Sequence, residues 1–109
     1  MKPGKIELGS ASIYLSHSQI VPPTKRGFAR EIREFFVPEV DRGKGFGTAL
    51  LEEVCTQADE KRILLLIIAD NDRLQEFYER HGFQLIQDDG KKLMARPCKR
   101  SLNDPYNRR

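Results

Sequence analysis

A glycine-rich stretch at residues 41–48, Asp-Arg-Gly-Lys-Gly-Phe-Gly-Thr, is the feature that most constrains the fold of this chain of 109 residues. It follows a segment rich in aromatic and β-branched residues (30–37) and opens an amphipathic segment (46–58), so the order strand, turn, helix is predicted. Glycines let a backbone pass close to an anion and adopt positive φ angles. The free amide groups of the turn, the helix dipole and the cations Arg42 and Lys44 would then face one point. The stretch therefore predicts a site for a phosphate group.

The spacing of the glycines separates several kinds of phosphate loop. A Walker loop needs four residues between its first glycine and a Gly-Lys-Ser/Thr, and the dinucleotide pattern needs glycine or alanine where Thr48 stands. The pattern R-x-x-G-x-G does fit, through Arg42, Gly45 and Gly47. It resembles the acetyl-coenzyme A pyrophosphate loop of the GNAT N-acetyltransferases. The alternative interpretation is a glycine-rich turn with solvated charges.

A second segment, residues 71–83, reads Asn-Asp-Arg-Leu-Gln-Glu-Phe-Tyr-Glu-Arg-His-Gly-Phe. It resembles the other signature of the same family, N-x-x-A-x-x-F-Y-E-x-x-G-F. The matching positions are Asn71, Phe77, Tyr78, Glu79, Gly82 and Phe83, whereas Leu74 replaces the small residue. Residues 36–40 also resemble the family's V-x-P-x-x-R approach to the glycine loop. The segments follow one another in the family's order and spacing, and the resemblance covers residues 27–96.

Composition bounds the classes of protein to which the chain can belong. Hydrophobic residues make up 39% and charged residues 32%, which is typical of a soluble globular domain. We expect this domain at residues 1–97, followed by a polar tail at 98–109. No apolar run approaches the roughly 20 residues of a membrane-spanning helix, and no membrane partner is expected. Two cysteines, Cys55 and Cys98, do not form a disulfide framework and favour the cytoplasm.

The charged and metal-ligating residues argue against two further classes. The net charge of +3 is a mild bias, and no basic stripe with interleaved aromatic residues is present, so binding of nucleic acid is not expected. Neither His17 nor His81 has the spacing of a metal ligand, and no cysteine pair exists, so no metal is expected.

Hydrophobic periodicity predicts an α+β fold. The expected elements are strands at 5–8 and 11–16, a loop at 17–26, strands at 27–37 and 62–68, helices from 45 and from 71 or 72, and a hairpin at 83–87 and 91–96. In the strand at 27–37, strict alternation places Ile32, Glu34 and Phe36 on one face and Glu31 and Phe35 on the other.

The resemblance implies a truncated GNAT fold with a central mixed sheet and the order β-β-β-α-β-α-β-β. The family's first strand and first two helices would be missing. Those helices usually wall the acceptor side, so this side is expected to be open or covered by a second chain in a homodimer. The layout is also similar to that of small phage-encoded acetyltransferases.

The resemblance further implies that acetyl-coenzyme A is the cosubstrate. Backbone groups of Phe35, Phe36 and Val37 would pair with the pantetheine arm. Amide groups of the loop would bind the pyrophosphate beside Arg42; they belong to Gly43, Lys44, Gly45, Phe46, Gly47 and Thr48. Asn71 would hold the far end of the arm, and a plain helix N-cap is the compatible alternative.

Two roles remain to be filled for acetyl transfer to an amine. Tyr78 stands at the position of the family's tyrosine that protonates the leaving thiolate; a phenol has a pKa of about 10 against about 8.5 for a thiol, so it stays protonated. The alternative is a core tyrosine with its hydroxyl satisfied locally. The base would be Glu31, preferred because it aligns with the strand glutamate of protein-acetylating members, or Glu34; a salt-bridged carboxylate is the alternative. His81 is either a proton relay or a helix-terminal histidine.

The sequence thus predicts an N-acetyltransferase that acts on a primary amine, and the shortened layout favours a protein lysine or N-terminus. An acetyltransferase for small amines whose acceptor pocket is completed by a dimer is one alternative. A coenzyme A-binding module without turnover, acting as a regulator or inhibitor of a partner protein, is another.

Overall fold

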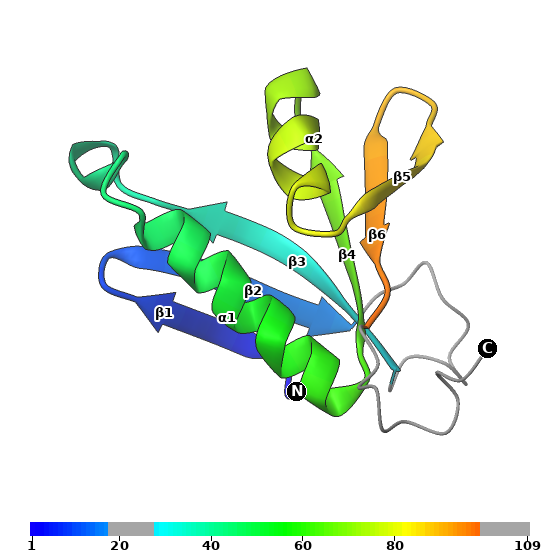
Figure 1. Cartoon of the computed structure of the whole chain (residues 1–109), viewed down its shortest axis with the longest axis horizontal. Coiled ribbons are helices and arrows are strands. Elements are labelled where there is room, and N and C mark those ends of the chain that lie inside the picture. Colours follow the sequence, from blue (N-terminus) through cyan, green and yellow to red (C-terminus); the bar gives the residue numbers. More distant parts are fainter. Residues whose placement is uncertain (18–27, 99–109) are drawn as a thin grey trace.

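The computed structural model describes residues 1–17 and 28–98 (Figure 1). The elements are β1 (Gly4–Leu8), β2 (Ala11–His17), β3 (Ala29–Phe36), a 3-10 turn (Glu39–Asp41), α1 (Phe46–Lys61), β4 (Leu64–Ala69), α2 (Asp72–Glu79), β5 (Gln84–Asp88) and β6 (Lys92–Arg96). The loop predicted at 17–26 and the tail predicted at 98–109 lie outside the described residues, apart from His17 and Cys98. His17 ends β2 and so does not belong to the loop.

Within the described residues, six strands form one mixed sheet in the order β1-β2-β3-β4-β6-β5. Only β3 and β4 run parallel, and the other neighbours are antiparallel. The predicted α+β class, the mixed sheet and the order of elements are therefore confirmed. The continuous apolar run of β4 reflects its central position between β3 and β6, which leaves Leu65, Leu66 and Ile67 buried and only Ile68 exposed.

Both helices pack against one face of this sheet and enclose the core there. The predicted apolar stripe of α1 is confirmed, because Leu50, Leu51 and Val54 are fully buried against Ile13 and Leu15 of β2. Each such side chain contributes about 1.5–3 kcal/mol by leaving water. We call the opposite face of the sheet the helix-free face, because neither α1 nor α2 covers it.

A β-bulge in β3 overturns the predicted alternation along this strand. Tyr14 pairs with Glu34 and Leu15 pairs with Ile32, so Arg33 is an extra residue between them. The extra residue shifts the phase of the strand by one. Phe35 consequently shares the core face with Ile32, and the expectations that Phe36 would share the face of Ile32 and that Phe35 would lie on the other are wrong.

The bulge also changes the relation between the two candidate glutamates. Glu31 pairs with Ser16 and Glu34 pairs with Tyr14, and these two partners lie two residues apart on β2. Residues two apart share a face, so both glutamates lie on the helix-free face. The expectation that they face opposite ways is wrong for the same reason.

Beyond the bulge, β3 and β4 separate. Their parallel pairing extends from Ala29 with Leu64 to Ile32 with Ile67 and stops there. Both strands continue further, to Phe36 and Ala69, and Figure 1 shows them diverging. The part of β3 after Ile32 therefore has no strand partner on its β4 side.

Arg96 joins three separate parts of the fold. It is only 4% exposed, and its guanidinium binds both carboxylate oxygens of Asp59 in α1, at 2.8 and 3.0 Å. Its Nε donates to the carbonyl oxygen of His81, after α2, at 2.9 Å. Gly82 follows with a φ of 93°, where a Cβ would come within 3.3 Å of Arg96 Nε. The arginine therefore holds α1, the end of α2 and β6 together.

We expect Asp59→Ala to lower the free energy of unfolding by about 3 kcal/mol, because it leaves the buried guanidinium of Arg96 without a counter-charge. Urea denaturation would measure the change. Glu60→Ala, on the exposed side of the same helix, is the matched control and should change stability by less than about 0.5 kcal/mol. Equal stabilities of the two variants would show that the ion pair does not hold these elements.

Candidate functional site

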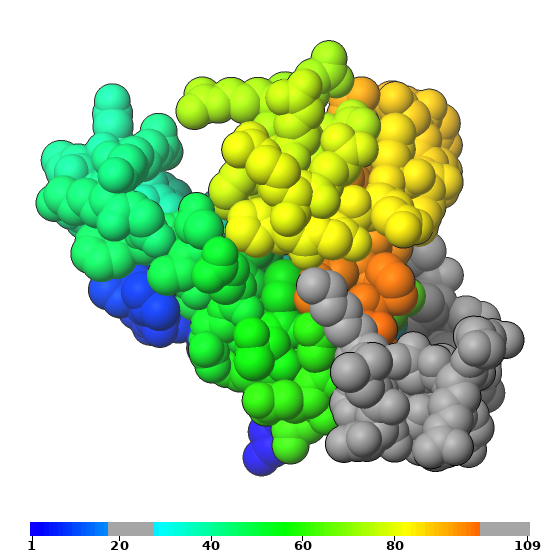
Figure 2. Space-filling view, viewed as in Figure 1, coloured from blue at the N-terminus to red at the C-terminus, as the bar shows by residue number. Residues whose placement is uncertain are grey.

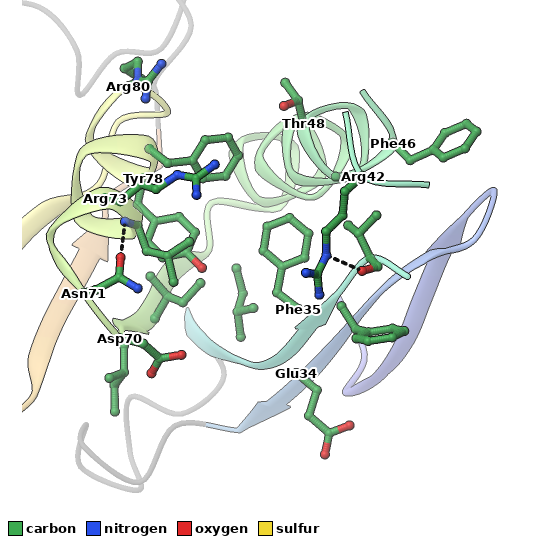
Figure 3. A pocket seen from close by; sticks show the side chains of 18 of the residues that line it. Glu34, Phe35, Arg42, Phe46, Thr48, Asp70, Asn71, Arg73, Tyr78 and Arg80 are labelled. Atoms are coloured by element: carbon green, nitrogen blue, oxygen red, sulfur yellow. Dashed lines mark hydrogen bonds between the residues drawn. The ribbon is translucent and has the colours of Figure 1, made fainter. Parts of the chain in front are cut away.

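A cleft of about 900 Å³ opens where β3 and β4 diverge. One wall consists of the end of β3, the glycine loop (residues 42–48) and the first turn of α1. The other wall consists of the end of β4 and one side of α2. Figure 2 shows the surface hollowed between these two walls, and Figure 3 shows the side chains that line the hollow.

The glycine loop presents unpaired amide groups to this cleft. Gly43 and Gly45 have φ angles of 87° and 86°, which favour glycine strongly. The first bond of the helix runs from Ala49 N to Gly45 O, at 3.0 Å. Among the described residues, the amides of the three positions before Ala49 therefore have no acceptor, and all three line the cleft. Their free N–H groups and the helix dipole make this end of the cleft attractive to an anion.

Two close contacts fix the loop in place. A Cβ on Gly47 would come within 3.0 Å of Val37 Cγ2, so α1 begins in direct contact with the end of β3. The ring of Phe46 packs over Gly9, in the turn between β1 and β2, where a Cβ would meet it at 3.2 Å. Figure 3 shows this ring pointing away from the cleft, so the backbone of Phe46, and not its side chain, serves the site.

The two cations predicted for the loop have different surroundings. Arg42 lines the cleft, and its Nε donates to the carbonyl oxygen of Val37 at 3.1 Å, which ties the loop to the end of β3 (Figure 3). Lys44 does not line the cleft; its ammonium pairs with Asp41 at 2.8 Å. That hydrogen bond holds the pKa of the Asp41 carboxyl below its usual value.

Two further arginines line the facing wall, and the sequence reasoning missed them. Arg73 and Arg80 both come from the α2 segment and border the cleft. They stand seven positions apart, about two helical turns, so they share one side of the helix with Phe77. This spacing could have revealed them, because two arginines on one side of a helix that borders a predicted phosphate site are candidate ligands for phosphate.

Asn71 caps α2. Its Oδ1 accepts from the amide of Leu74 at 2.9 Å, so the predicted N-cap is confirmed. The residue also lines the cleft, and its amide nitrogen has no hydrogen-bond partner among residues 1–17 and 28–98. The capping oxygen and the free NH₂ group can serve different partners at the same time.

Tyr78 lies in the last turn of α2 and is buried, with only 4% of its surface exposed. Its ring packs against Phe77 and Phe83, with centroids 5.6 and 5.8 Å away. Its phenol borders the cleft and makes no hydrogen bond to the described part of the chain. Burial, reinforced by the negative charge of Asp70, raises the pKa of Tyr78 to about 12. The phenol therefore stays protonated at neutral pH and is free to donate.

The candidate bases differ in their access to the cleft. Glu34 lines it, whereas Glu31 does not and pairs with Arg33 at 2.8 Å. A third carboxylate, Asp70, lines the cleft at the end of β4 and was not singled out in the sequence.

The other residues considered in the sequence do not contribute to the cleft. His81 lies outside the cleft lining, and its ring packs against Phe77 with centroids 5.0 Å apart. Burial lowers the pKa of this histidine. Among the described residues, no three His, Cys, Asp or Glu side chains are grouped so that they could hold a metal ion. Neither α1 nor α2 has the length and apolar character of a membrane-spanning helix.

The comparison with known families decides what this arrangement represents. The family model described as an acetyltransferase (GNAT) domain matches residues 6–85, most of the chain. This chain belongs to the GNAT family. A comparison with curated proteins found no match. The resemblance to phage-encoded members stays a prediction.

Solved structures share the fold of this chain. Ard1 from Thermoplasma volcanium is 21% identical, with a TM-score of 0.65, over 83% of this chain and 64% of its own. The ribosomal-protein-S18-alanine N-acetyltransferase from Escherichia coli is 19% identical, with a TM-score of 0.65, over 86% of this chain and 65% of its own. N-acetylglutamate synthase from Neisseria gonorrhoeae, complexed with coenzyme A and L-arginine, is 18% identical, with a TM-score of 0.64, over 84% of this chain and 22% of its own. The chain thus spans less than two thirds of the length of each.

We expect Gly47→Ala to lower the free energy of unfolding by about 1 kcal/mol. An alanine in a helix is ordinarily about 1 kcal/mol better than glycine, but overpacking costs about 1–3 kcal/mol, and the Cβ would press on Val37. A double-mutant cycle with Val37→Ala, followed by urea denaturation, should show favourable coupling of about 1 kcal/mol. A stabilised Gly47→Ala protein would contradict the close contact.

Proposed function

We propose that this protein transfers an acetyl group from acetyl-coenzyme A to a primary amine. The observation that carries the proposal is the pairing of two features in one cleft: unpaired amides at the start of α1, and a buried phenol without a partner at Tyr78. The first suits a pyrophosphate and the second suits a developing thiolate. An elongated donor with an anionic end and a thioester end matches both.

Several residues would hold the donor. The amides of residues 46–48, with Arg42 beside them, would bind the pyrophosphate. Among the described residues, β3 has no strand partner on its β4 side beyond Ile32. The backbone of Phe35 and Phe36 could therefore pair on that side with the amides of the pantetheine arm. The carbonyl of Val37 already accepts from Arg42, so this residue would contribute through its side chain or its second lone pair.

Asn71 and the arginines would complete this set of contacts. The free NH₂ group of Asn71 would donate to the far end of the pantetheine arm. Arg73 and Arg80 would add positive charge on the α2 wall. Lys44, paired with Asp41, would contribute its backbone and a long-range charge.

Tyr78 would stabilise the sulfur as the carbon–sulfur bond breaks. With a pKa of about 12, its phenol exceeds the thiol value of about 8.5 by about 3.5 units. Complete transfer of the proton to a free thiolate would therefore cost about 5 kcal/mol. A strong hydrogen bond from Tyr78 to the sulfur is the favourable alternative, and it is the role that we assign to this residue.

We propose a protein amine, a lysine or an N-terminus, as the acceptor. The helix-free face beside the cleft exposes the aromatic side chains of Tyr14 and Phe36, by 44% and 54%, which offers a surface for a polypeptide. A screen of small amines and peptides would distinguish this acceptor from a small molecule enclosed by a second copy of the chain. Both cysteines are free thiols, which agrees with the cytoplasmic location that we also propose.

Calorimetric titration with acetyl-coenzyme A tests the donor site. Asn71→Asp keeps the capping oxygen but loses the NH₂ donor, so stability should stay within about 0.5 kcal/mol while affinity falls about tenfold. Asn71→Ala should lose about 1 kcal/mol of stability as well. Unchanged affinity in Asn71→Asp would remove this residue from the site, and no binding by the wild-type protein would overturn the proposed function.

Tyr78→Phe removes only the phenol oxygen and should lower kcat about 100-fold with folding intact. In the wild-type protein, the rate with hydroxylamine, an acceptor that is uncharged at neutral pH, should not change with protonation of the acceptor as the pH rises from neutral. Because the acid form of Tyr78 is present below its pKa of about 12, no falling limb should appear up to about pH 11. Steady-state rates across this range, with circular dichroism as a folding check, would measure it. A decline that begins near pH 10 would contradict the raised pKa.

A further inference from the structure

Asp70 stands at the end of β4, at the point where the cleft meets the helix-free face. In β4, Ile67 and Ala69 are buried on the core side, each 3% exposed, whereas Ile68 between them is 39% exposed. Continuing this alternation places Asp70 on the side of Ile68. Tyr78 belongs to α2 on the core side, so the two groups border the same opening from opposite faces of the sheet.

The geometry of the side chains distinguishes Asp70 from the other carboxylates. Figure 3 shows its carboxylate reaching toward the opening beside Tyr78, whereas the carboxylate of Glu34 points away from it. Glu31 does not line the cleft, and Asp41 is paired with Lys44 at the opposite end. Within residues 1–17 and 28–98, the carboxylate of Asp70 takes part in no ion pair or hydrogen bond.

The electrostatic relation between Asp70 and Tyr78 supports their proximity. The negative charge of Asp70 helps to keep the proton on the Tyr78 phenol, in addition to the larger effect of burial.

We propose that Asp70 binds the ammonium group of the acceptor and accepts its proton. This inference rests on the proposed function and adds the class of acceptor, a primary amine that arrives with a positive charge through the helix-free face. A carboxylate at the entrance attracts such a group and orients its nitrogen toward the carbonyl carbon of the thioester.

The proposed step conserves atoms and charge. Asp70 takes one proton from the ammonium nitrogen, whose lone pair then forms the bond to the carbonyl carbon. The carbon–sulfur bond breaks while Tyr78 hydrogen-bonds the departing sulfur. The nitrogen loses its second proton to solvent, and the thiolate, held by the hydrogen bond from Tyr78, takes up one proton from solvent. Asp70 releases the first proton to solvent. The products are an amide, a thiol and one proton.

Exclusion of water from the cleft favours the transfer of a proton from the ammonium group to Asp70. In bulk water an ammonium group does not readily give its proton to a carboxylate. When the acceptor covers the cleft, both charged groups lose solvation, and the neutral pair of amine and carboxylic acid becomes more favourable.

The first test measures proximity and needs no acceptor. Asp70→Cys and, as matched control, Asp72→Cys would each be made with Cys98→Ser and treated with bromoacetyl-coenzyme A. Asp72 lies two positions further, pairs with Lys92 and does not line the cleft. A thiol near the reacting carbon displaces bromide and forms a thioether, which mass spectrometry detects. Cys55 is buried and present in both proteins.

We expect about tenfold more adduct at position 70 than at position 72, with protection by acetyl-coenzyme A. Equal labelling, or labelling of position 72 alone, would overturn the inference while leaving the proposed function intact, provided that the reagent competes with acetyl-coenzyme A. Failure of the reagent and of acetyl-coenzyme A to bind would overturn the proposed function and this inference with it.

The second test separates recognition of charge from general loss of activity. Asp70→Asn should lower kcat/KM about 100-fold for a blocked peptide with one lysine, but less than about threefold for hydroxylamine, which is uncharged at neutral pH. Asp72→Asn should behave like the wild-type protein. An equal loss with both acceptors, or a loss in Glu34→Gln and none in Asp70→Asn, would overturn the role of Asp70. If the wild-type protein acetylates neither probe, the labelling result decides.

Discussion

The separation of β3 from β4 is the constraint on which the rest of the site depends. Four residue pairs join the strands, and the bulge at Arg33 then bends β3 away from its neighbour. Continued pairing would fill the space between the strands with backbone hydrogen bonds. Separation instead leaves one side of β3 unpaired and opens the cleft between α1 and α2. The one-residue bulge thus accounts both for the cleft and for the unpaired backbone groups of β3 along it.

Separate contacts hold the two walls apart. On one wall, the contact of Gly47 with Val37 and the hydrogen bond of Arg42 tie the glycine loop to β3. On the other wall, Arg96 links the end of α2 and β6 to Asp59 of α1. Because α1 takes part in both sets of contacts, it acts as a common reference for the two walls. These contacts favour a cleft that has the same geometry before and after a ligand binds.

Much of the site could be predicted because its chemistry is local in the chain. The glycine loop needs glycine where φ is positive, and the N-cap of α2 needs a short polar side chain; both requirements appear as fixed spacings. The two missed arginines share a helical face with Phe77, and this periodicity was available without coordinates. Asp70 carried no comparable signal, because an aspartate before an N-cap is ordinary on the surface of any protein.

By itself, the sequence determined the order of the elements, the glycine loop, the cap at Asn71 and the family. Each depends on neighbours within a few positions along the chain. Only the tertiary structure decided which candidate groups meet. It put Glu34 and Asp70 at the cleft, paired Glu31 with Arg33, and turned Phe35 into the core. The reason is that a single bulge reverses the side of every later residue in β3, and a bulge is set by packing between strands that are distant in the sequence.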